Sequence, residues 1–379
     1  MERVEVDVAI VGGGVVGLAL AESISRRQPA ASIALFERHD RFGSEISSRN
    51  SEVVHAGLYY RGQPLKQRLC VEGRHLLYAF CERHAVPHRR CGKLIIATHP
   101  AQLAGLAALA AHAREGGVPI EELPLEAARQ RSGNAQAVGA IWSPTTGIVD
   151  SHALMTSLEA LARDRGVMFC YRSTVDAAED ASGRGCAFAV QGPEGRYSVR
   201  ARIFLNAAGL ASAQILRLLQ PREPVAIRPC RGRYFALSRR WTGSQQHLLY
   251  PLPDPAGGLG VHLTFDLNGD CRLGPDVDWS SQDRASDDWD LYRFDEDPSL
   301  LDRFFEAGKR LLPALERGDL SPGYVGVRPK LFVEGVLHPD FRILRDPPGA
   351  AWHLLGIESP GLTAALALAE EIAEEAVWH

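Results

Sequence analysis

Four residues near the start of the chain have the types and the spacing of a dinucleotide-binding turn. Gly12, Gly14 and Gly17 follow an apolar run, and Glu37 ends a second apolar run. In such a turn the first glycine permits a tight bend, the second lets the backbone approach a pyrophosphate, and the third lets a helix pack closely on a strand. An acid at the end of the second strand suits the hydroxyl groups of a ribose. The pattern predicts a bound dinucleotide, which is either FAD or a nicotinamide.

The elements around these residues have the order that such a site requires. Residues 4–11 alternate and then become apolar, an apolar helical segment follows, and residues 33–37 form a second apolar run. This order predicts strand, turn, helix and strand. The helix that begins at the turn would direct unpaired N–H groups and a partial positive charge at the phosphates. A glycine pattern alone is weak evidence, so the prediction rests on the register of all these parts.

A polar loop directly after the second strand is another candidate part of the site. Residues 43–60 are polar at first and end on small residues and two tyrosines. Asn50 and Ser51 can donate hydrogen bonds to phosphates or ring carbonyls, and the small pair at 56–57 leaves room for a flat group. Long polar loops after a binding strand are often functional, so we expect cofactor contacts here rather than only a solvated connection.

A helix start near the end of the chain could face the same cofactor. Residues 362–377 carry apolar side chains on one helical face, and Pro360 and Gly361 precede them. The N–H groups at this start would favour a partly negative atom, such as the N1/O2 edge of a reduced flavin. A simple helix cap is the alternative interpretation.

The rest of the chain predicts mixed α/β structure followed by an antiparallel region. Residues 166–209 have strand patterns, and alternating strands recur between 221 and 323. Residues 144–150 are expected to form a turn and the acidic residues 280–297 a surface excursion. The helices expected between the first and last motifs are residues 65–81, 101–115, 121–131, 151–165 and 298–312.

Composition excludes some classes of function. The 379 residues are 45% hydrophobic and 23% charged with a formal net charge of -4, which argues against a nucleic-acid surface or a polybasic anchor. The chain opens almost directly into a strand, and its apolar stretches fall short of a membrane span of ~20 residues. We therefore expect a cytoplasmic protein, with peripheral contact to the inner face of the membrane left open.

The cysteines predict neither a metal site nor a disulfide framework. Their number is odd, and no pair has the two-residue spacing of a metal clip or a redox dithiol. Reduced thiols fit the cytoplasm, so electron transfer would use an organic cofactor. The seven cysteines are Cys70, Cys81, Cys91, Cys170, Cys186, Cys230 and Cys271.

Several segments together resemble one family. The chain is similar, almost end to end, to the FAD-dependent oxidoreductases of the D-amino-acid oxidase superfamily, and within it to the L-2-hydroxyglutarate dehydrogenases and oxidases. The superfamily likeness rests on the N-terminal motif and on residues 206–209 (NAAG), 326–329 (GVRP) and 359–361 (SPG). The narrower likeness rests on residues 49–60, 69–73, 146–150, 231–234 and 260–264. Glu52, Arg233 and Glu358 depart from the narrower pattern, which bears on the substrate more than on the cofactor.

The resemblance implies an α/β protein with a Rossmann-like FAD-binding domain of the glutathione-reductase type. A second, α+β substrate domain would be built on an antiparallel sheet. The FAD-binding domain would comprise residues 1–85, 145–220 and 325–379, and the substrate domain residues 86–144 and 221–324. The residues expected to contact FAD are Gly12, Gly14, Gly17, Glu37, Arg38, Ser47, Asn50, Ser51, His55, Val175, Ala208, Gly209, Gly361, Leu362 and Thr363.

Because only one dinucleotide motif is present, the substrate itself would reduce the flavin. The resemblance implies oxidation of a small 2-hydroxy acid, with L-2-hydroxyglutarate to 2-oxoglutarate as the best match, by hydride transfer to flavin N5. His262 and His55 are the candidate bases, since an imidazole titrates near neutral pH. Arg328 is the candidate carboxylate anchor, since a guanidinium offers two parallel hydrogen bonds. The further substrate contacts expected are Tyr60, Lys66, Arg231 and Thr264.

Two other functions stay open, and the electron acceptor would be oxygen or a quinone. An oxidase or dehydrogenase of amino acids or amines would use the same fold and arginine anchor, although an unprotonated amine needs no protein base. A flavin-binding redox sensor without turnover is the other alternative, and the sequence adds no signalling segment in its favour.

Overall fold

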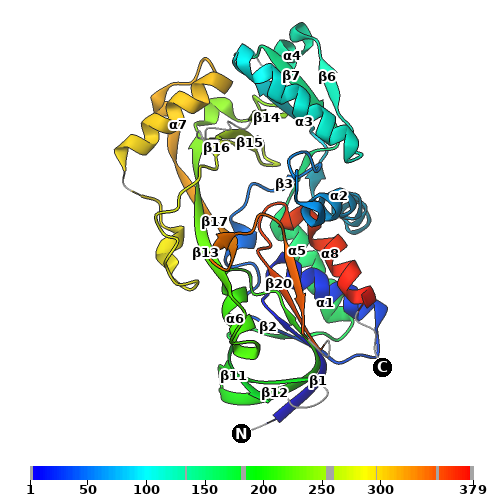
Figure 1. Cartoon of the computed structure of the whole chain (residues 1–379). Coiled ribbons are helices and arrows are strands. Elements are labelled where there is room, and N and C mark those ends of the chain that lie inside the picture. The colour runs from blue at the N-terminus through cyan, green and yellow to red at the C-terminus, as the bar shows by residue number, and fades with distance from the viewer. Residues whose placement is uncertain are drawn as a thin grey trace.

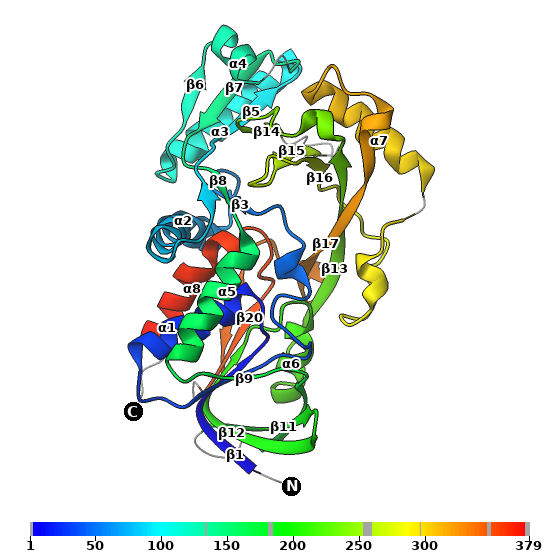
Figure 2. The ribbon, with the colours of Figure 1, turned by 180° about the vertical axis from the view of Figure 1, so that it is seen from behind.

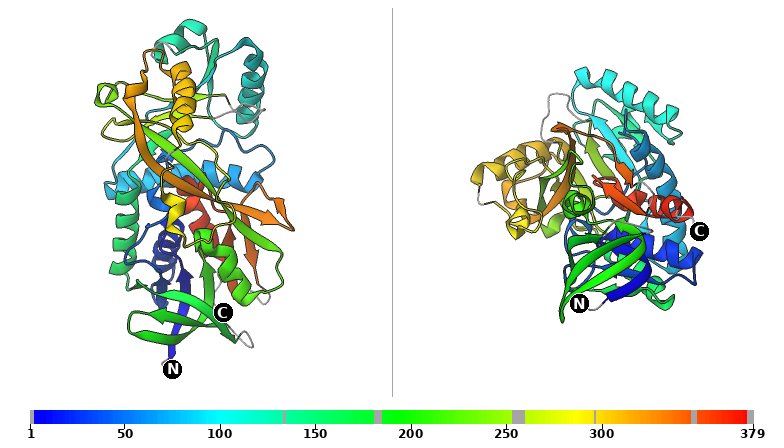
Figure 3. Two further views of the ribbon diagram at one scale, coloured as in Figure 1. Left: turned by 90° about the vertical axis from the view of Figure 1, so that its left-hand side faces the viewer. Right: turned by 60° about the horizontal axis from the view of Figure 1, so that its bottom comes forward.

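Two large β-sheets at opposite ends of an elongated molecule organise the fold (Figure 1). This computed structural model describes residues 3–132, 135–180, 185–252, 260–295, 297–346 and 350–375. The long strands β13 (Val225–Leu237) and β17 (Leu320–Val333) run side by side between the two ends (Figure 3). Within these ranges, every helix is too short or too polar to cross a membrane.

The first sheet has the order β10-β11-β12-β1-β2-β9, with β20 beside β12 and β19 beside β20. Its mutually parallel strands are β1 (Arg3–Val11), β2 (Ile33–Phe36), β9 (Met168–Cys170), β12 (Gly195–Asn206) and β20 (Ala351–Leu355). The antiparallel additions are β10 (Thr174–Asp180), β11 (Cys186–Gly192) and β19 (Arg342–Arg345). The predicted strand, turn, helix and strand at the start of the chain is confirmed.

Helices cover this sheet and supply its core. The helices α1 (Val15–Arg27), α5 (Ser151–Asp164) and α8 (Gly361–Glu375) lie together (Figure 2), and α2 (Pro64–His84) packs on α8. Val8 and Ile10 of β1 are fully buried against this layer. Residues 376 and 377 of the predicted last helix lie outside the described residues. The short helix α6 (Ser212–Leu219) follows β12.

The second sheet has the order β18-β17-β13-β16-β15-β14-β5-β7-β6. All its strand pairs are antiparallel except β5 with β14, as the predicted antiparallel region requires. Its remaining strands are β5 (Lys93–Ala97), β6 (Glu121–Leu123), β7 (Gly139–Ser143), β14 (Leu248–Pro251), β15 (His262–Phe265), β16 (Cys271–Gly274) and β18 (Val336–Leu337). Its helices are α3 (Leu103–Glu115), α4 (Leu125–Arg131) and α7 (Pro298–Leu311).

The two faces of this second sheet have different neighbours. Leu249, Leu263 and Leu273 are cross-strand partners on one face. That face meets α7, because a Cβ added at Gly308 would lie 2.4 Å from Leu273 Cδ1. Since successive side chains point to opposite faces, Tyr250 and His262 lie on the face turned away from α7. This face looks toward the first sheet and forms one wall of the cavity described below.

Three local predictions need correction. The helix predicted over residues 121–131 begins as strand β6, which pairs with the edge of β7, and α4 starts only after Pro124. The turn predicted at 144–150 contains β8 (Gly147–Val149), which lies between β3 (Val53–Val54) and β4 (His88–Arg89). Pairing with distant strands overrode the local propensity in both cases.

The third correction concerns the acidic segment 280–297, which is more than a surface excursion. Leu291 is fully buried in a cluster with Leu210 and Val327, although Trp289 is exposed. The predicted domain boundary between residues 324 and 325 falls inside β17, which pairs with β13 on both sides of it. The two-domain division stays a proposal, supported by the two sheets.

Candidate active site

A cavity of about 560 Å³ extends from the glycine turn of the first sheet to the face of the second sheet that is turned away from α7. It brings together most of the residues that the sequence nominated, from segments far apart in the chain. The nominated residues that line it are Gly12, Gly14, Glu37, Arg38, Ser47, Asn50, Ser51, His55, Val175, Ala208, Gly209, His262, Arg328, Gly361 and Leu362. Gly17, Thr363, Tyr60, Lys66, Arg231 and Thr264 are not part of its lining.

The glycine turn has room only for glycine. Gly12 adopts φ +107°, and a Cβ there would lie 2.5 Å from the carbonyl oxygen of Ala207. Gly17 lies outside the cavity lining, but a Cβ on it would come within 1.9 Å of Gly12 O, so it lets α1 pack against the turn. Glu37 fixes the turn: its Oε2 accepts a hydrogen bond from Gly13 N at 2.7 Å, and its Oε1 accepts one from His39 N at 2.8 Å.

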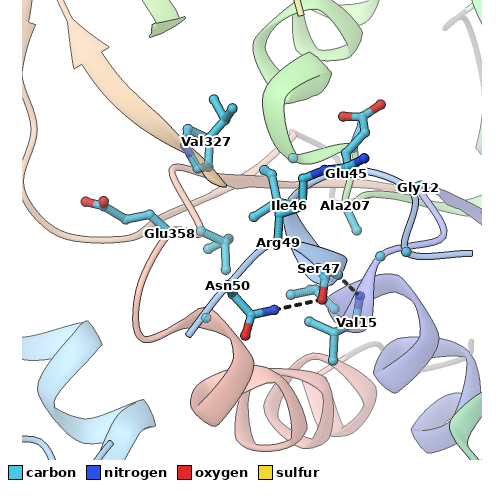
Figure 4. A pocket seen from close by; sticks show the side chains of 18 of the residues that line it. Gly12, Val15, Glu45, Ile46, Ser47, Arg49, Asn50, Ala207, Val327 and Glu358 are labelled. Atoms are coloured by element: carbon cyan, nitrogen blue, oxygen red, sulfur yellow. Dashed lines mark hydrogen bonds between the residues drawn. The ribbon is translucent and has the colours of Figure 1, made fainter. Parts of the chain in front are cut away.

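The polar loop lies against the start of α1, as Figure 4 shows. Ser47 Oγ accepts a hydrogen bond from Val15 N at 3.0 Å, and Asn50 Nδ2 donates to Ser47 O at 2.7 Å. Arg38 pairs with Glu45, whose pKa is lowered below its usual value by His39 and Arg38 against the opposing effect of burial. The loop therefore holds one wall of the cavity in place with its own polar groups.

Small residues after β12 form another wall. Asn206 is fully buried, and its Nδ2 donates to Ser212 O at 2.8 Å while its Oδ1 accepts from Ala208 N at 3.2 Å. These bonds fix the turn that carries Ala208 and Gly209 into the cavity. Gly209 has φ +54°, which favours glycine.

The start of α8 closes the cavity beside His55. Gly361 and Leu362 line it, whereas the Thr363 side chain is fully buried behind them. Thr363 Oγ1 accepts a hydrogen bond from His55 N at 3.0 Å. Thr363 therefore positions the backbone of His55 rather than facing the cavity.

His262 and Arg328 occupy the end of the cavity formed by the second sheet. The His262 ring stacks on Tyr250, with centroids 3.6 Å apart and planes 9° from parallel. Arg328 donates from Nη1 to Arg231 O at 3.1 Å and from Nη2 to Asp276 O at 3.0 Å. No described carboxylate pairs with Arg328, so its charge is available to an anionic ligand.

Burial favours the neutral form of His55 and His262, two of the histidines that line the cavity. Burial lowers the pKa of His55 to about 3, and the charge of Lys93 adds to the effect. Burial also lowers the pKa of His262 well below 6.5, with smaller contributions from Lys93, His55 and Arg328. A neutral imidazole has a ring nitrogen that can accept a proton. His55 Nε2 lies 3.4 Å from Ser359 Oγ, and its Nδ1 is buried without a hydrogen-bond partner.

Four nominated substrate contacts lie elsewhere for physical reasons. Arg231 sits on β13 one residue from the cavity-lining Gly232, so it points to the other face and pairs there with Asp278 and Asp295. Lys66 is buried and donates from Nζ to Glu358 at 3.0 Å. Thr264 is fully buried next to the wall, and Tyr60 also lies outside the lining.

Sequence reasoning missed several cavity residues. Tyr234, Tyr250 and Glu358 line the cavity, and Lys93 lies directly behind Tyr250, with Nζ 4.6 Å from the ring centroid. For Lys93 a signal existed: it is the only charged residue in the otherwise apolar run at 93–97. A lysine in a buried strand is unusual, because a charged side chain is almost never fully buried unless it is paired.

Comparison with known proteins decides the family. The model of the FAD dependent oxidoreductases (DAO) matches residues 7–375. The chain belongs to this family. It is 35% identical to the mitochondrial L-2-hydroxyglutarate dehydrogenase of Arabidopsis thaliana over 98% of the chain and 83% of that protein. It is 27% identical to L-2-hydroxyglutarate dehydrogenase of Escherichia coli K12 over 97% of the chain and 92% of that protein.

Solved structures confirm the α/β flavoenzyme fold. L-alpha-glycerophosphate oxidase from Mycoplasma pneumoniae, solved with FAD bound, superposes with a TM-score of 0.85 at 22% identity, covering 100% of this chain and 96% of that one. Glycine oxidase from Geobacillus kaustophilus gives a TM-score of 0.78 at 18% identity, with 100% and 96% covered. Together with the family model and the curated relatives, this fold makes the chain an FAD-dependent oxidoreductase.

The residues around the cavity fit FAD. The Gly12 turn leaves space for a pyrophosphate at the start of α1, and Glu37 lies at the end of β2 where a ribose would lie. The start of α8 at Gly361 offers N–H groups to the part of a bound FAD that lies away from the Gly12 turn. Within the described residues, no group of three or more His, Cys, Asp or Glu side chains could hold a metal ion.

Replacement of Gly12 by alanine is expected to weaken FAD binding about tenfold or more, because the new Cβ clashes with Ala207 O and φ +107° is strained. Flavin absorbance per mole of purified protein measures the loss. Gly318→Ala is the control, since a Cβ there meets nothing within 4 Å and its φ is unremarkable. Equal flavin content in both variants would contradict this account of the turn.

Proposed function

We propose that the protein oxidises L-2-hydroxyglutarate to 2-oxoglutarate, using FAD. The observation that carries the proposal is that His262 and Arg328 face one cavity of a chain whose relatives include L-2-hydroxyglutarate dehydrogenases. A neutral imidazole and a guanidinium without an acidic partner are the groups that a 2-hydroxy acid requires.

The two residues divide the work on the substrate. Arg328 holds the carboxylate next to the reacting carbon with two parallel hydrogen bonds and so orients the C–H bond. His262 accepts the hydroxyl proton at a ring nitrogen as that carbon loses a hydride and the C–O bond becomes a carbonyl. Bound FAD supplies the acceptor for the hydride and its two electrons. Tyr250 keeps the imidazole plane fixed by stacking on it.

The remaining nominated residues complete the proposed cofactor site. Gly12, Gly14 and Ser47 would surround the phosphates and Glu37 the ribose, while His55 would lie beside the flavin ring. An amine substrate would not need His262, because an unprotonated amine loses no hydroxyl proton. The histidine therefore favours the hydroxy acid over an amino acid.

Anaerobic titration of the purified yellow protein tests the proposal. L-2-hydroxyglutarate is expected to bleach the flavin band completely at about one equivalent, and D-2-hydroxyglutarate and glycine are expected to leave it unchanged. Bleaching by glycine alone would indicate oxidation of an amine in place of a hydroxy acid. If none of the three compounds bleached the flavin, L-2-hydroxyglutarate would be excluded as the substrate.

The electron acceptor completes the proposed function, and we propose oxygen or a quinone. Mixing the reduced protein with dissolved oxygen and, separately, with a soluble quinone identifies which of them restores the flavin band faster. A quinone acceptor would require contact with the inner face of a membrane, and co-sedimentation with vesicles measures that contact.

A further inference from the structure

Lys93 is a buried lysine without an acidic partner. It is 1% exposed, and its Nζ lies 4.7 Å from the ring centroid of Tyr59 and 4.6 Å from that of Tyr250. Within the described part of the chain, its ammonium makes neither a salt bridge nor a hydrogen bond. These two aromatic faces and the buried thiol of Cys70 are among its described neighbours, and they compensate a buried charge only in part.

Several other buried cations of the chain are paired with acids. Lys66 Nζ lies 3.0 Å from Glu358, Arg272 Nη2 lies 3.6 Å from Glu52, and Arg233 pairs with Asp276 at 2.5 Å. Lys93 and Arg328 differ from them in lacking a described carboxylate partner. An uncompensated buried charge is costly, and burial lowers the pKa of Lys93 to about 7. An anionic ligand at these two cations would remove that cost.

The register of the second sheet places Lys93 behind the cavity wall, on the same sheet face as Tyr250, although Lys93 is not itself part of the lining. Lys93 is the cross-strand partner of Leu248, so it shares a face with Tyr250 two residues further along β14. Tyr250 in turn stacks on His262, which lines the cavity. The positive charge of Lys93 also contributes to the lowered pKa of both His55 and His262, in agreement with a place near these two side chains.

Polar atoms without partners surround this lysine. Tyr59 Oη, His55 Nδ1 and Thr264 Oγ1 are buried and have no hydrogen-bond partner among the residues that the structure describes. Tyr59 contacts Lys93 directly, and Thr264 lies on the same sheet face, opposite Leu248. Unsatisfied buried groups are rare in native proteins, and several beside an unpaired ammonium are the surroundings that a carboxylate would satisfy.

We propose that Lys93, together with the Tyr59 hydroxyl, binds the second carboxylate of a dicarboxylic 2-hydroxy acid, while Arg328 binds the first. This assignment rests on the proposed function and adds the residue that sets its substrate class. It requires the second carboxylate to enter beside the ring of Tyr250. Lys66 and Lys330 are excluded from this role because Glu358 engages both.

Kinetics with two substrates of equal length test the assignment. Lys93→Met is expected to lower kcat/KM for L-2-hydroxyglutarate about 100-fold, because a desolvated charge pair is lost. For L-2-hydroxypentanoate, in which a methyl group replaces the second carboxylate, kcat/KM is expected to change less than about threefold. Lys309→Met, on the exposed side of α7, is the control and should leave both values at wild-type level. An equal fall for both substrates would assign Lys93 a general role and overturn the proposal.

Binding of two acids that are not oxidised tests the Lys93 subsite independently of the proposed reaction. Perturbation of the oxidised flavin spectrum measures binding of glutarate and of pentanoate without turnover, so it can be read even if the wild type oxidises neither hydroxy acid. The wild type is expected to bind glutarate more tightly, and Lys93→Met to lose that difference, with Lys93→Gln as a second variant should the first not fold. Equal affinity of the wild type for the two acids would overturn the subsite.

Discussion

Replacement of His262 by asparagine is expected to lower kcat for the oxidation of L-2-hydroxyglutarate about 10²- to 10⁴-fold, the range for loss of a positioned general base. Asparagine keeps a polar group of similar size beside Tyr250 but cannot take a proton. The flavin should remain bound, because His262 lies on the second sheet and far along the cavity from the Gly12 turn. Anaerobic single-turnover reduction of the flavin measures the step directly.

The pH dependence of the wild type provides an independent check on His262. Since burial holds the pKa of this histidine well below 6.5, the imidazole stays neutral as the pH falls through 6.5, and the reductive rate should not drop there. Only the protonated imidazole is inactive as a base, so the reductive rate is expected to fall at a pH well below 6.5. His152→Asn, an exposed histidine on α5, is the control. A full rate in His262→Asn together with a slow His55→Asn would transfer the role of base to His55.

The parts of the site that sequence predicts well are those with local causes. Gly17 is required by its contact with Gly12 O, and Gly12 by the positive φ of the turn, so both causes lie within one strand, turn and helix unit. The close approach of Gly12 to Ala207 O is a long-range contact that the local pattern does not show. Asn206 likewise acts within six residues, through Ser212 O and Ala208 N. For Gly17 and Asn206 the decisive contact lies close to the residue's own place in the chain.

The face of a strand is harder to predict. Arg231 and Arg328 both belong to recognised motifs, yet Arg328 faces the cavity while Arg231 is turned away to Asp278 and Asp295. The alternation along β13 assigns these faces, but which face becomes the cavity wall depends on where α7 packs. The position of α7 is set by contacts such as that of Gly308 with Leu273, and both residues are well separated from Arg231 in the sequence.

Long-range pairing also explains what the sequence did not indicate. Lys93 lies beside the cavity wall because β5 pairs in parallel with β14, which is more than 150 residues later in the chain. The short strands β6 and β8 likewise form because they pair with other strands, and local propensity does not indicate those partners. For Lys93 the local signal was a charged residue inside an otherwise apolar strand.

Replacement of Arg328 by methionine is expected to lower kcat/KM for L-2-hydroxyglutarate about 10²- to 10³-fold, mostly through KM, because the carboxylate loses two charge-assisted hydrogen bonds. Lysine at this position should recover little of the loss, since an ammonium cannot form the parallel pair. Steady-state kinetics of both variants measure the effect. Arg303→Met, an exposed residue of α7, is the matched control. Near-normal kcat/KM in Arg328→Met would exclude it as the anchor.

The same variant makes a second, electrostatic test possible. The charge of Arg328 is one of the causes that lower the pKa of His262, so its removal should raise that pKa toward 6.5. Protonation of the imidazole then begins at a higher pH, and the acid side of the rate profile of Arg328→Met should move upward in pH relative to wild type. A weaker anchor without such a shift would mean that Arg328 binds the substrate but lies too far from His262 to influence its proton.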